Sequence, residues 1–97
     1  MKILGVHAGT QSMELLVSKL EPFWKETGAD LEVEICSLND YEKKAGDFDL
    51  IMIAPQVAYH QEDIAQKSGK PVIVIEPTDY ALGNVGNITW QINNVKR

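Results

Sequence analysis

Four short apolar runs recur along the chain, and each is bounded by glycine, proline, aspartate or asparagine. Runs of this length between such residues are typical of β-strands. The third and fourth runs are almost continuously apolar, as expected for parallel strands covered on both faces. In the second run Glu32 and Glu34 alternate with apolar residues, which favours an edge strand with one face partly wet. The predicted strands cover residues 3–6, 31–35, 50–54 and 72–75.

The segments between and after these strands show the three- and four-residue spacing of amphipathic helices. The first predicted helix covers residues 12–27 and ends before Gly28, because glycine suits the left-handed conformation that often follows a helix. Pro22 removes one backbone hydrogen bond, so a kink or break is expected near Ser18. The inward stripe of this helix is Leu16, Leu20, Phe23 and Thr27. Further helices are predicted over residues 40–45 and 61–68 and from residue 86 onward, the last with Ile88, Ile92 and Val95 inward.

This alternation of strands and helices predicts an α/β fold. Strands joined through helices in one sheet make right-handed crossovers, so the four strands are expected to be parallel, with helices on both faces. The edge character of the second strand favours an open sheet of order 2-1-3-4 in a three-layer sandwich, formed by one domain over residues 1–97. Ligands of such sheets bind beyond the carboxyl ends of the strands, where the strand order reverses. The loops over residues 7–12 and 54–59 therefore form the predicted crevice.

Composition narrows the classes of function. The chain has 97 residues, with 14 acidic and 9 basic side chains, and its formal net charge of -5 disfavours binding to nucleic acids and anionic membranes. The first apolar run is too short for a signal peptide or a membrane span. Cys36 is the only cysteine, and the two histidines lack the spacing of a metal site. We expect a cytoplasmic monomer with no metal, no other cofactor and no membrane insertion.

The loop over residues 7–12 is the first candidate for chemistry. It leads from a strand into the N-terminus of a helix, where free N–H groups and the helix dipole favour an anion. Its small residues let the backbone approach a ligand, as in P-loops, although neither a GxGxxG nor a Walker pattern is present. On spacing alone, a plain connecting loop is the better interpretation.

Three segments, in the same order as in a known family, favour a functional loop over a plain connection. Residues 7–19, HAGTQSMELLVSK, resemble the first loop and helix of the enzyme IIB components of the lactose/cellobiose sugar phosphotransferase system, where the pattern is CSAGMSTSLLV. Residues 54–59 resemble the Gly-Pro-Gln loop of that family. Residues 70–83, with Pro71-Val72 and Asp79-Tyr80, resemble its fourth strand and the loop that follows. The resemblance covers nearly the whole chain and implies a four-stranded parallel sheet.

The resemblance also implies a function. The cysteine of the family accepts a phosphoryl group from a histidine of a IIA protein and passes it to sugar at a IIC membrane permease. Aligned without a gap, that position holds His7, and aligned with a one-residue gap it holds Val6. An imidazole is a competent nucleophile near neutral pH, so His7 is the candidate acceptor. The implied phosphate loop is Ala8, Gly9, Thr10, Gln11, Ser12 and Met13, and the implied partner-contacting crevice loop contributes Pro55, Gln56 and Tyr59.

Two alternatives stay open at this stage. The imidazole is longer than a thiol side chain, and Glu14 places a negative charge in the first helical turn, where it competes with a phosphate for the helix dipole. These features favour a phosphorylation-silent IIB-like module that still binds IIA or IIC and acts as a regulator. A flavodoxin-like domain for a small ligand ranks last, because the loop lacks the hydroxyl-rich sequence of flavodoxins.

The remaining reactive or aromatic residues are assigned structural roles. Cys36 lies on the second strand, away from a helix N-terminus that would lower its pKa, so it is interpreted as an ordinary thiol. His60 precedes acidic residues and is expected at a solvated helix start. Trp24 and Trp90 are both expected to pack at the rim of the core.

Overall fold

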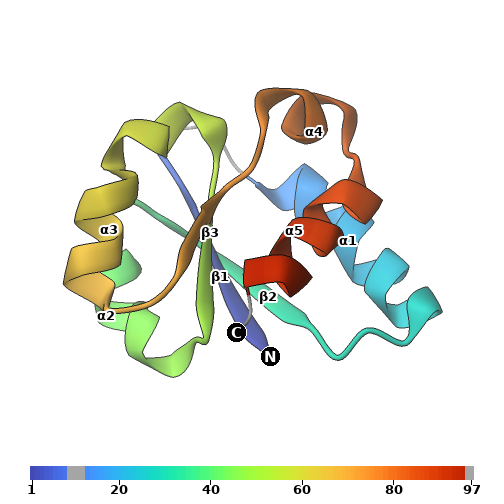
Figure 1. The fold of residues 1–97 in the computed structure, drawn as a ribbon, viewed down its shortest axis with the longest axis horizontal. Coiled ribbons are helices and arrows are strands. Elements are labelled where there is room, and N and C mark those ends of the chain that lie inside the picture. The colour runs from blue at the N-terminus through green and yellow to red at the C-terminus, as the bar shows by residue number, and fades with distance from the viewer. Residues whose placement is uncertain (9–12, 96–97) are drawn as a thin grey trace.

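The computed structural model describes residues 1–8 and 13–95 of the chain. Four parallel strands form one open sheet of order β2-β1-β3-β4, which confirms the predicted topology (Figure 1). In this register Val6 lies between Cys36 on one side and Ile53 on the other. The strands are β1 (Lys2–His7), β2 (Glu32–Ser37), β3 (Leu50–Ile53) and β4 (Val72–Val74).

Helices cover both faces of the sheet and complete the predicted three layers. In Figure 1, α2 and α3 lie on one side of the sheet, and α1, α4 and α5 lie on the other. Short 3-10 helices, η1 and η2, adjoin α2 and α3 in the sequence. The helical elements are α1 (Glu14–Thr27), α2 (Tyr41–Lys44), η1 (Ala45–Asp47), η2 (Pro55–His60), α3 (Gln61–Ser68), α4 (Pro77–Leu82) and α5 (Val85–Val95).

Each face of the sheet has its own apolar cluster, because successive side chains of a strand point to opposite faces. On β3, Met52 packs beneath α1 and α5, whereas Ile51 and Ile53 pack beneath α2 and α3. The first cluster is completed by residues such as Leu16, Leu20, Trp24, Ile88 and Ile92. The second is completed by residues such as Leu4, Val6, Tyr41, Val57 and Ile64.

The α1 helix departs from its predicted form in two respects. It continues through Pro22, so the expected break near Ser18 is wrong. Ser18 is exposed, so water can hydrate the carbonyl that loses its N–H partner. The buried stripe is Leu16, Leu20 and Trp24, whereas Thr27, expected inward, is exposed. Gly28 follows the helix with a φ of 73° and confirms the predicted end.

The chain after β4 also differs from the prediction, which placed the fourth strand and a following loop within residues 70–83 and a single last helix from residue 86. The structure has two helices there, α4 and α5, joined by a turn at Gly83 with a φ of 67°. Pro77 occupies the first turn of α4, a position that suits proline because its missing N–H has no partner there in any case. The sequence thus carries a start signal and a stop signal for α4, at Pro77 and Gly83.

Candidate functional site

The predicted crevice lies where β1 and β3 end side by side. The N–H of Ala54 donates to the carbonyl of Val6 at 3.1 Å, so the chain leaves β3 directly beside the end of β1. On the other side, the N–H of Leu38 donates to the carbonyl of His7 at 2.7 Å. His7 is therefore held between the exits of β2 and β3. Gly9, Thr10, Gln11 and Ser12, the centre of the predicted P-loop-like segment, lie outside the described residues.

The His7 side chain is half-buried and has two unlike nitrogens. Its Nδ1 is enclosed and has no hydrogen-bond partner among the described residues. A buried nitrogen of this kind cannot meet a ligand or a partner protein, and leaving it unpaired costs free energy. The enclosure of Nδ1 leaves Nε2 as the ring nitrogen to consider for any chemistry at His7.

The two described ends of the predicted phosphate loop are anchored by packing. Ala8 is half-buried against the cluster beneath α2 and α3. Met13 has no exposed surface, and its carbonyl accepts the N–H of Val17 at 2.9 Å. Gly5 makes room for Met13, because a Cβ at Gly5 would lie 3.2 Å from the Met13 sulfur. The side chain of Met13 thus faces the core, and only its backbone is available to a phosphate.

The crevice loop after β3 presents side chains outward. Pro55 starts the 3-10 helix η2, and Val57 anchors it with a fully buried side chain. Gln56 is exposed, and Tyr59 is 80% exposed, with its ring centroid 4.2 Å from that of His60. The Tyr59 ring therefore packs on His60 at the start of α3, while most of its surface stays exposed and accessible to a partner. His60 begins α3 as expected, although it is half-buried rather than fully solvated.

Other large apolar side chains are exposed on elements that follow the carboxyl ends of the strands. Leu15, in the first turn of α1, is 73% exposed, and Leu82, at the end of α4, is 66% exposed. Glu14 precedes Leu15 and is also exposed, as an acid in the first helical turn. These side chains are accessible on the surface, as single apolar residues are in most soluble proteins.

Cys36 offers no alternative nucleophile. It is buried on β2, beneath the helices on the face opposite α1. Burial raises the pKa of its thiol to about 11, and although Lys44 opposes the rise, Asp40 and Glu34 add to it. A thiol with a pKa this high is almost entirely protonated at neutral pH, and the thiolate is the reactive form. The interpretation of Cys36 as an ordinary packed thiol agrees with the structure.

We expect Cys36 to react slowly with iodoacetamide in the native protein. At pH 8, the rise in pKa from 9.0 to about 11 lowers the thiolate fraction roughly a hundredfold, and burial restricts access further. The native rate should be at least about a hundredfold below the rate in urea, and it should rise with pH up to about 11. Intact-mass spectrometry of timed samples measures both rates. A native rate close to the rate in urea would contradict the buried environment.

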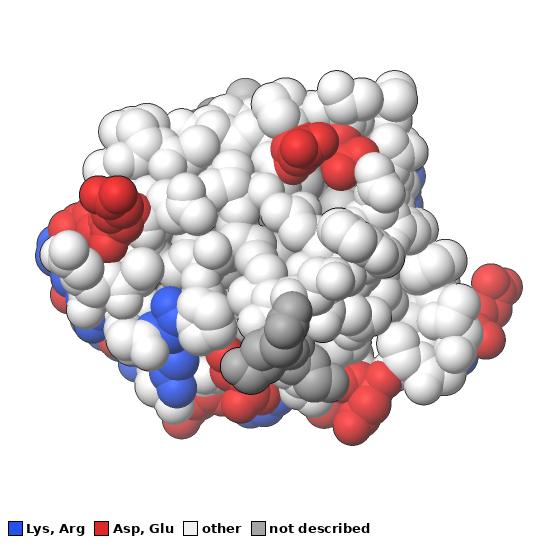
Figure 2. Space-filling view, viewed as in Figure 1, with Lys and Arg blue, Asp and Glu red and all other residues white. Residues whose placement is uncertain are grey.

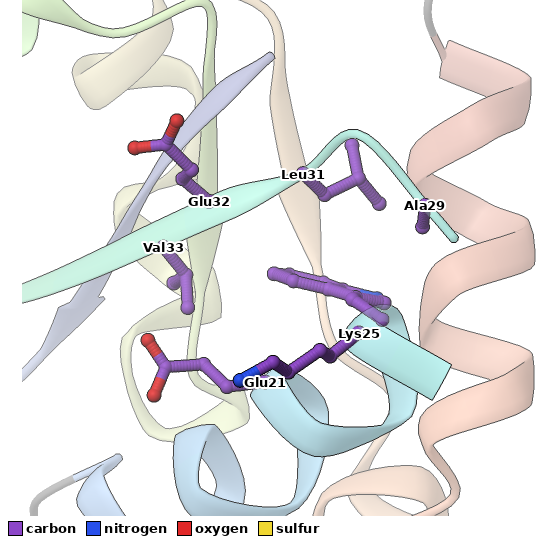
Figure 3. A pocket seen from close by; sticks show the side chains of 7 residues that line it. Glu21, Lys25, Ala29, Leu31, Glu32 and Val33 are labelled. Carbon is purple, nitrogen blue, oxygen red and sulfur yellow. The ribbon is translucent and has the colours of Figure 1, made fainter. Parts of the chain in front are cut away.

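A hollow of about 500 Å³ lies between α1 and the start of β2, away from the crevice (Figure 3). Glu21 and Lys25 border it from α1, and Leu31 and Val33 border it from the side of β2. Trp24, Ala29 and Glu32 complete the lining. Its residues combine apolar and oppositely charged groups and do not single out one ligand chemistry.

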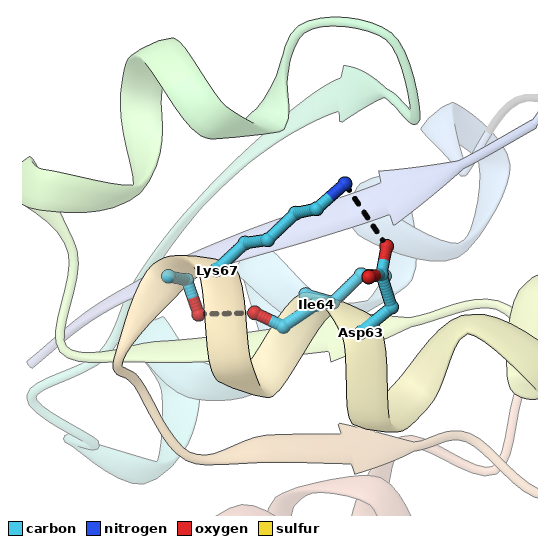
Figure 4. A network of polar contacts seen from close by, with 4 residues as sticks. Asp63, Ile64 and Lys67 are labelled. Atoms are coloured by element: carbon cyan, nitrogen blue, oxygen red, sulfur yellow. Dashed lines mark hydrogen bonds and ion pairs between the residues drawn. The ribbon is translucent and has the colours of Figure 1, made fainter.

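The charged surface of α3 is engaged within the helix itself. Lys67 Nζ lies 3.3 Å from an Asp63 carboxylate oxygen one turn earlier, and the Ser68 hydroxyl donates to the carbonyl of Ile64 at 2.6 Å (Figure 4). This ion pair raises the pKa of Lys67, first through its hydrogen bond to Asp63. Such pairs on an exposed helix face support the helix and indicate no catalytic role.

Comparison with known proteins identifies the family of this chain. The model of the lactose/cellobiose-specific IIB subunits of the phosphotransferase system matches residues 8–88. The chain belongs to this family. The match begins one residue after His7, so it does not include the candidate acceptor. Among residues 1–8 and 13–95 there is no group of three or more His, Cys, Asp or Glu suited to a metal ion. None of the helices in the same residues has the length and apolarity needed to cross a bilayer.

Individual relatives agree with this assignment. The galactose-specific EIIB component of Lactococcus lactis subsp. cremoris (strain MG1363) is 31% identical over 83 residues, which cover 77% of each chain. The cellobiose-specific IIB component of Borrelia burgdorferi superimposes with a TM-score of 0.77 at 25% identity, over 98% of this chain and 90% of the other. The lactose-specific IIB domain of Streptococcus pneumoniae superimposes with a TM-score of 0.80 at 17% identity, over 96% and 95%, and supports the fold.

Proposed function

We propose that this IIB-family chain is a phosphoryl carrier that takes phosphate from a IIA protein and passes it to a sugar of the lactose/cellobiose type at a IIC permease. His7 is the acceptor in this proposal. The observation that carries it is the place of His7, at the carboxyl end of β1 beside the end of β3, with Nδ1 enclosed. In open parallel sheets this point of strand reversal is where ligands bind. The carrier acts as a single domain in the cytoplasm.

The transfer follows from ordinary phosphoryl chemistry. With the proton of the neutral imidazole on Nδ1, the lone pair of Nε2 is available to attack the phosphorus of a phosphohistidine on IIA. One N–P bond forms on His7 while the N–P bond of the donor breaks. The donor imidazole keeps the electron pair of that bond and takes up one proton, which balances the proton that His7 releases when it is phosphorylated. The second transfer repeats these steps with a sugar hydroxyl as nucleophile and His7 as leaving group.

The exposed side chains around His7 support docking of the two partners. Tyr59 and Gln56 on η2 and Leu15 on α1 are exposed on the elements that follow β3 and β1 in the sequence. A carrier must bind two different proteins in turn. Its contacts should therefore exclude water from the site and still let each complex dissociate. In this proposal Pro55 fixes the direction in which η2 presents them.

A second candidate function is a phosphorylation-silent module that binds IIA or IIC and regulates transport. The absence of a thiol at the end of β1 favours it, because the cysteine typical of the family is replaced by a longer side chain. The position of Glu14 in the first turn of α1 favours it too, since a carboxylate there repels a phosphoryl group. The two functions share a docking surface and differ only in whether His7 gains a phosphate.

Intact-mass spectrometry separates these functions. The wild-type protein is incubated at neutral pH with phosphoenolpyruvate, the two general phosphotransferase proteins and a IIA partner, and the galactose-specific relative serves as a competent control. Gain of one phosphoryl group, lost on brief acid treatment, is the result expected of a carrier with a phosphohistidine. No gain in mass, while the control is phosphorylated, would overturn the carrier and leave the binding module, which a IIA pull-down then tests.

A further inference from the structure

A second hollow, of about 230 Å³, lies beyond the end of β4, where α4 and α5 meet. We call it the acidic hollow, because two carboxylates line it and none of its lining residues is basic. Figure 2 shows acidic atoms at the position of α4 with uncharged surface around them, while the other charged groups lie toward the rim of this face. The lining residues are Glu76, Asp79, Asn87, Trp90 and Gln91.

Asp79 is the unusual member of this set. Its side chain is 5% exposed, and it is the one buried charged residue among those described. Its Oδ1 accepts hydrogen bonds from the side-chain amides of Asn84, at 3.1 Å, and Asn87, at 3.3 Å. No hydrogen bond to Oδ2 and no ion pair to Asp79 occurs among the described residues. Both donors are neutral amides, so the carboxylate has no ion-pair partner among the described residues.

Trp90 contributes an exposed aromatic ring to the acidic hollow. Both tryptophans were expected to pack at the core, but Trp90 is 65% exposed and lines the acidic hollow. Gln91 fixes this part of α5, because its side-chain amide donates to the carbonyl of Val74 at 3.0 Å. An indole face attracts a cation through its π electrons, and the neighbouring carboxylates supply the negative charge. The hollow therefore combines an exposed indole with a buried carboxylate that has no ion-pair partner, and this combination favours a cationic ligand.

We propose that the acidic hollow binds a small organic cation, and that a guanidinium group is the best match. A guanidinium is planar, stacks on an indole and donates paired hydrogen bonds to a carboxylate. In this arrangement it stacks on Trp90 while it donates to Asp79 and Glu76. Among residues 1–8 and 13–95 there is no group of three or more His, Cys, Asp or Glu suited to a metal ion, so an organic cation is the better match. The proposal is independent of phosphoryl transfer, because it involves neither His7 nor the crevice.

Titration followed by nuclear magnetic resonance of the ¹⁵N-labelled protein tests this directly. Methylguanidinium chloride is added at constant ionic strength, and methylurea, which has the same shape without the charge, is the matched control. The indole N–H signal of Trp90 should move and saturate, with a dissociation constant on the order of millimolar. The indole of Trp24, which donates to Thr89, should move far less. A Trp90 signal that does not saturate, or that moves equally with methylurea, would overturn the proposal.

Three single substitutions test whether the cation binds in the acidic hollow. Glu76→Gln removes one exposed carboxylate and should weaken binding about tenfold. Trp90→Leu should weaken it about threefold, measured on neighbouring amide signals. Glu21→Gln, in the other hollow, is the matched control and should leave binding unchanged. Equal affinity in wild type and Glu76→Gln would also reject the site, and since both residues are exposed the variants should fold.

A third ligand distinguishes the two sources of a guanidinium. N-acetylarginine methylamide carries the same group on a peptide unit. Binding tighter than that of methylguanidinium would support the site and assign it to an arginine side chain of a polypeptide. Equal binding would support the site and assign it to a free small cation. If neither ligand shifts Trp90 in a saturable way, the acidic hollow is not a cation site.

Discussion

Replacing His7 by alanine is expected to abolish phosphoryl uptake completely. His7 ends β1, and the thiol of Cys36 on the neighbouring strand β2 is buried, with a pKa raised to about 11. Loss of a group that forms the covalent intermediate leaves no partial activity to measure. In the mass assay the wild type should gain one phosphoryl group and His7→Ala none, while both bind IIA with similar affinity. Persistent phosphorylation of His7→Ala would show that another residue accepts the phosphate.

Two further variants make that result specific. His60→Ala removes the other histidine of the chain, which begins α3, and should leave the added mass unchanged. His7→Cys combined with Glu14→Ser restores the thiol of the family and removes the acid from the first turn of α1. It should accept phosphate at least as fast as wild type, and the product should no longer have the acid lability of a phosphohistidine. No uptake by this double variant would mean that the loop has lost its anion site more broadly.

The sheet could be predicted from the sequence because its signals are local and independent. The alternating Glu32 and Glu34 placed β2 at an edge, and the apolar runs of β3 and β4 required cover on both faces. The stripe of α1 was less certain, because neighbouring positions on a helix differ by only about 100°. Periodicity brought residues 23, 24 and 27 near the same face, and only the packing against α5 decided that Trp24 is buried.

The acidic hollow shows what periodicity does not reveal. Glu76, Asp79 and Asn87 are polar residues that a sequence pattern assigns to loops or wet helix faces. They meet because the turn at Gly83 directs α5 back against β4, and that turn was missed with α4 itself. The two tryptophans were likewise assigned one role from their spacing, although one is buried and the other exposed. The burial of a single side chain depends on contacts between elements, which local spacing does not encode.

Trp24→Ala is expected to destabilise the fold by about 3–5 kcal/mol, the usual cost of removing a large aromatic side chain from a core. Trp24 is 2% exposed in the cluster between α1, α5 and the sheet. Its indole N–H also donates to the hydroxyl of Thr89 at 2.8 Å, so the same side chain joins α1 to α5. Because a domain of this size is only marginally stable, this loss is a large fraction of its free energy of unfolding. Urea unfolding followed by circular dichroism measures it as a lower midpoint.

Trp90→Ala is the matched control, since it removes the same side chain from an exposed site on α5. Its free energy of unfolding should stay within about 0.5 kcal/mol of wild type, as for most surface substitutions. Trp24→Phe keeps an aromatic ring and loses the hydrogen bond to Thr89, so it should fall between wild type and Trp24→Ala. Equal destabilisation by Trp24→Ala and Trp90→Ala would mean that both rings pack in solution, as their spacing alone suggests. Trp90 would then be unavailable to a cation, so the same urea midpoints also test the acidic hollow.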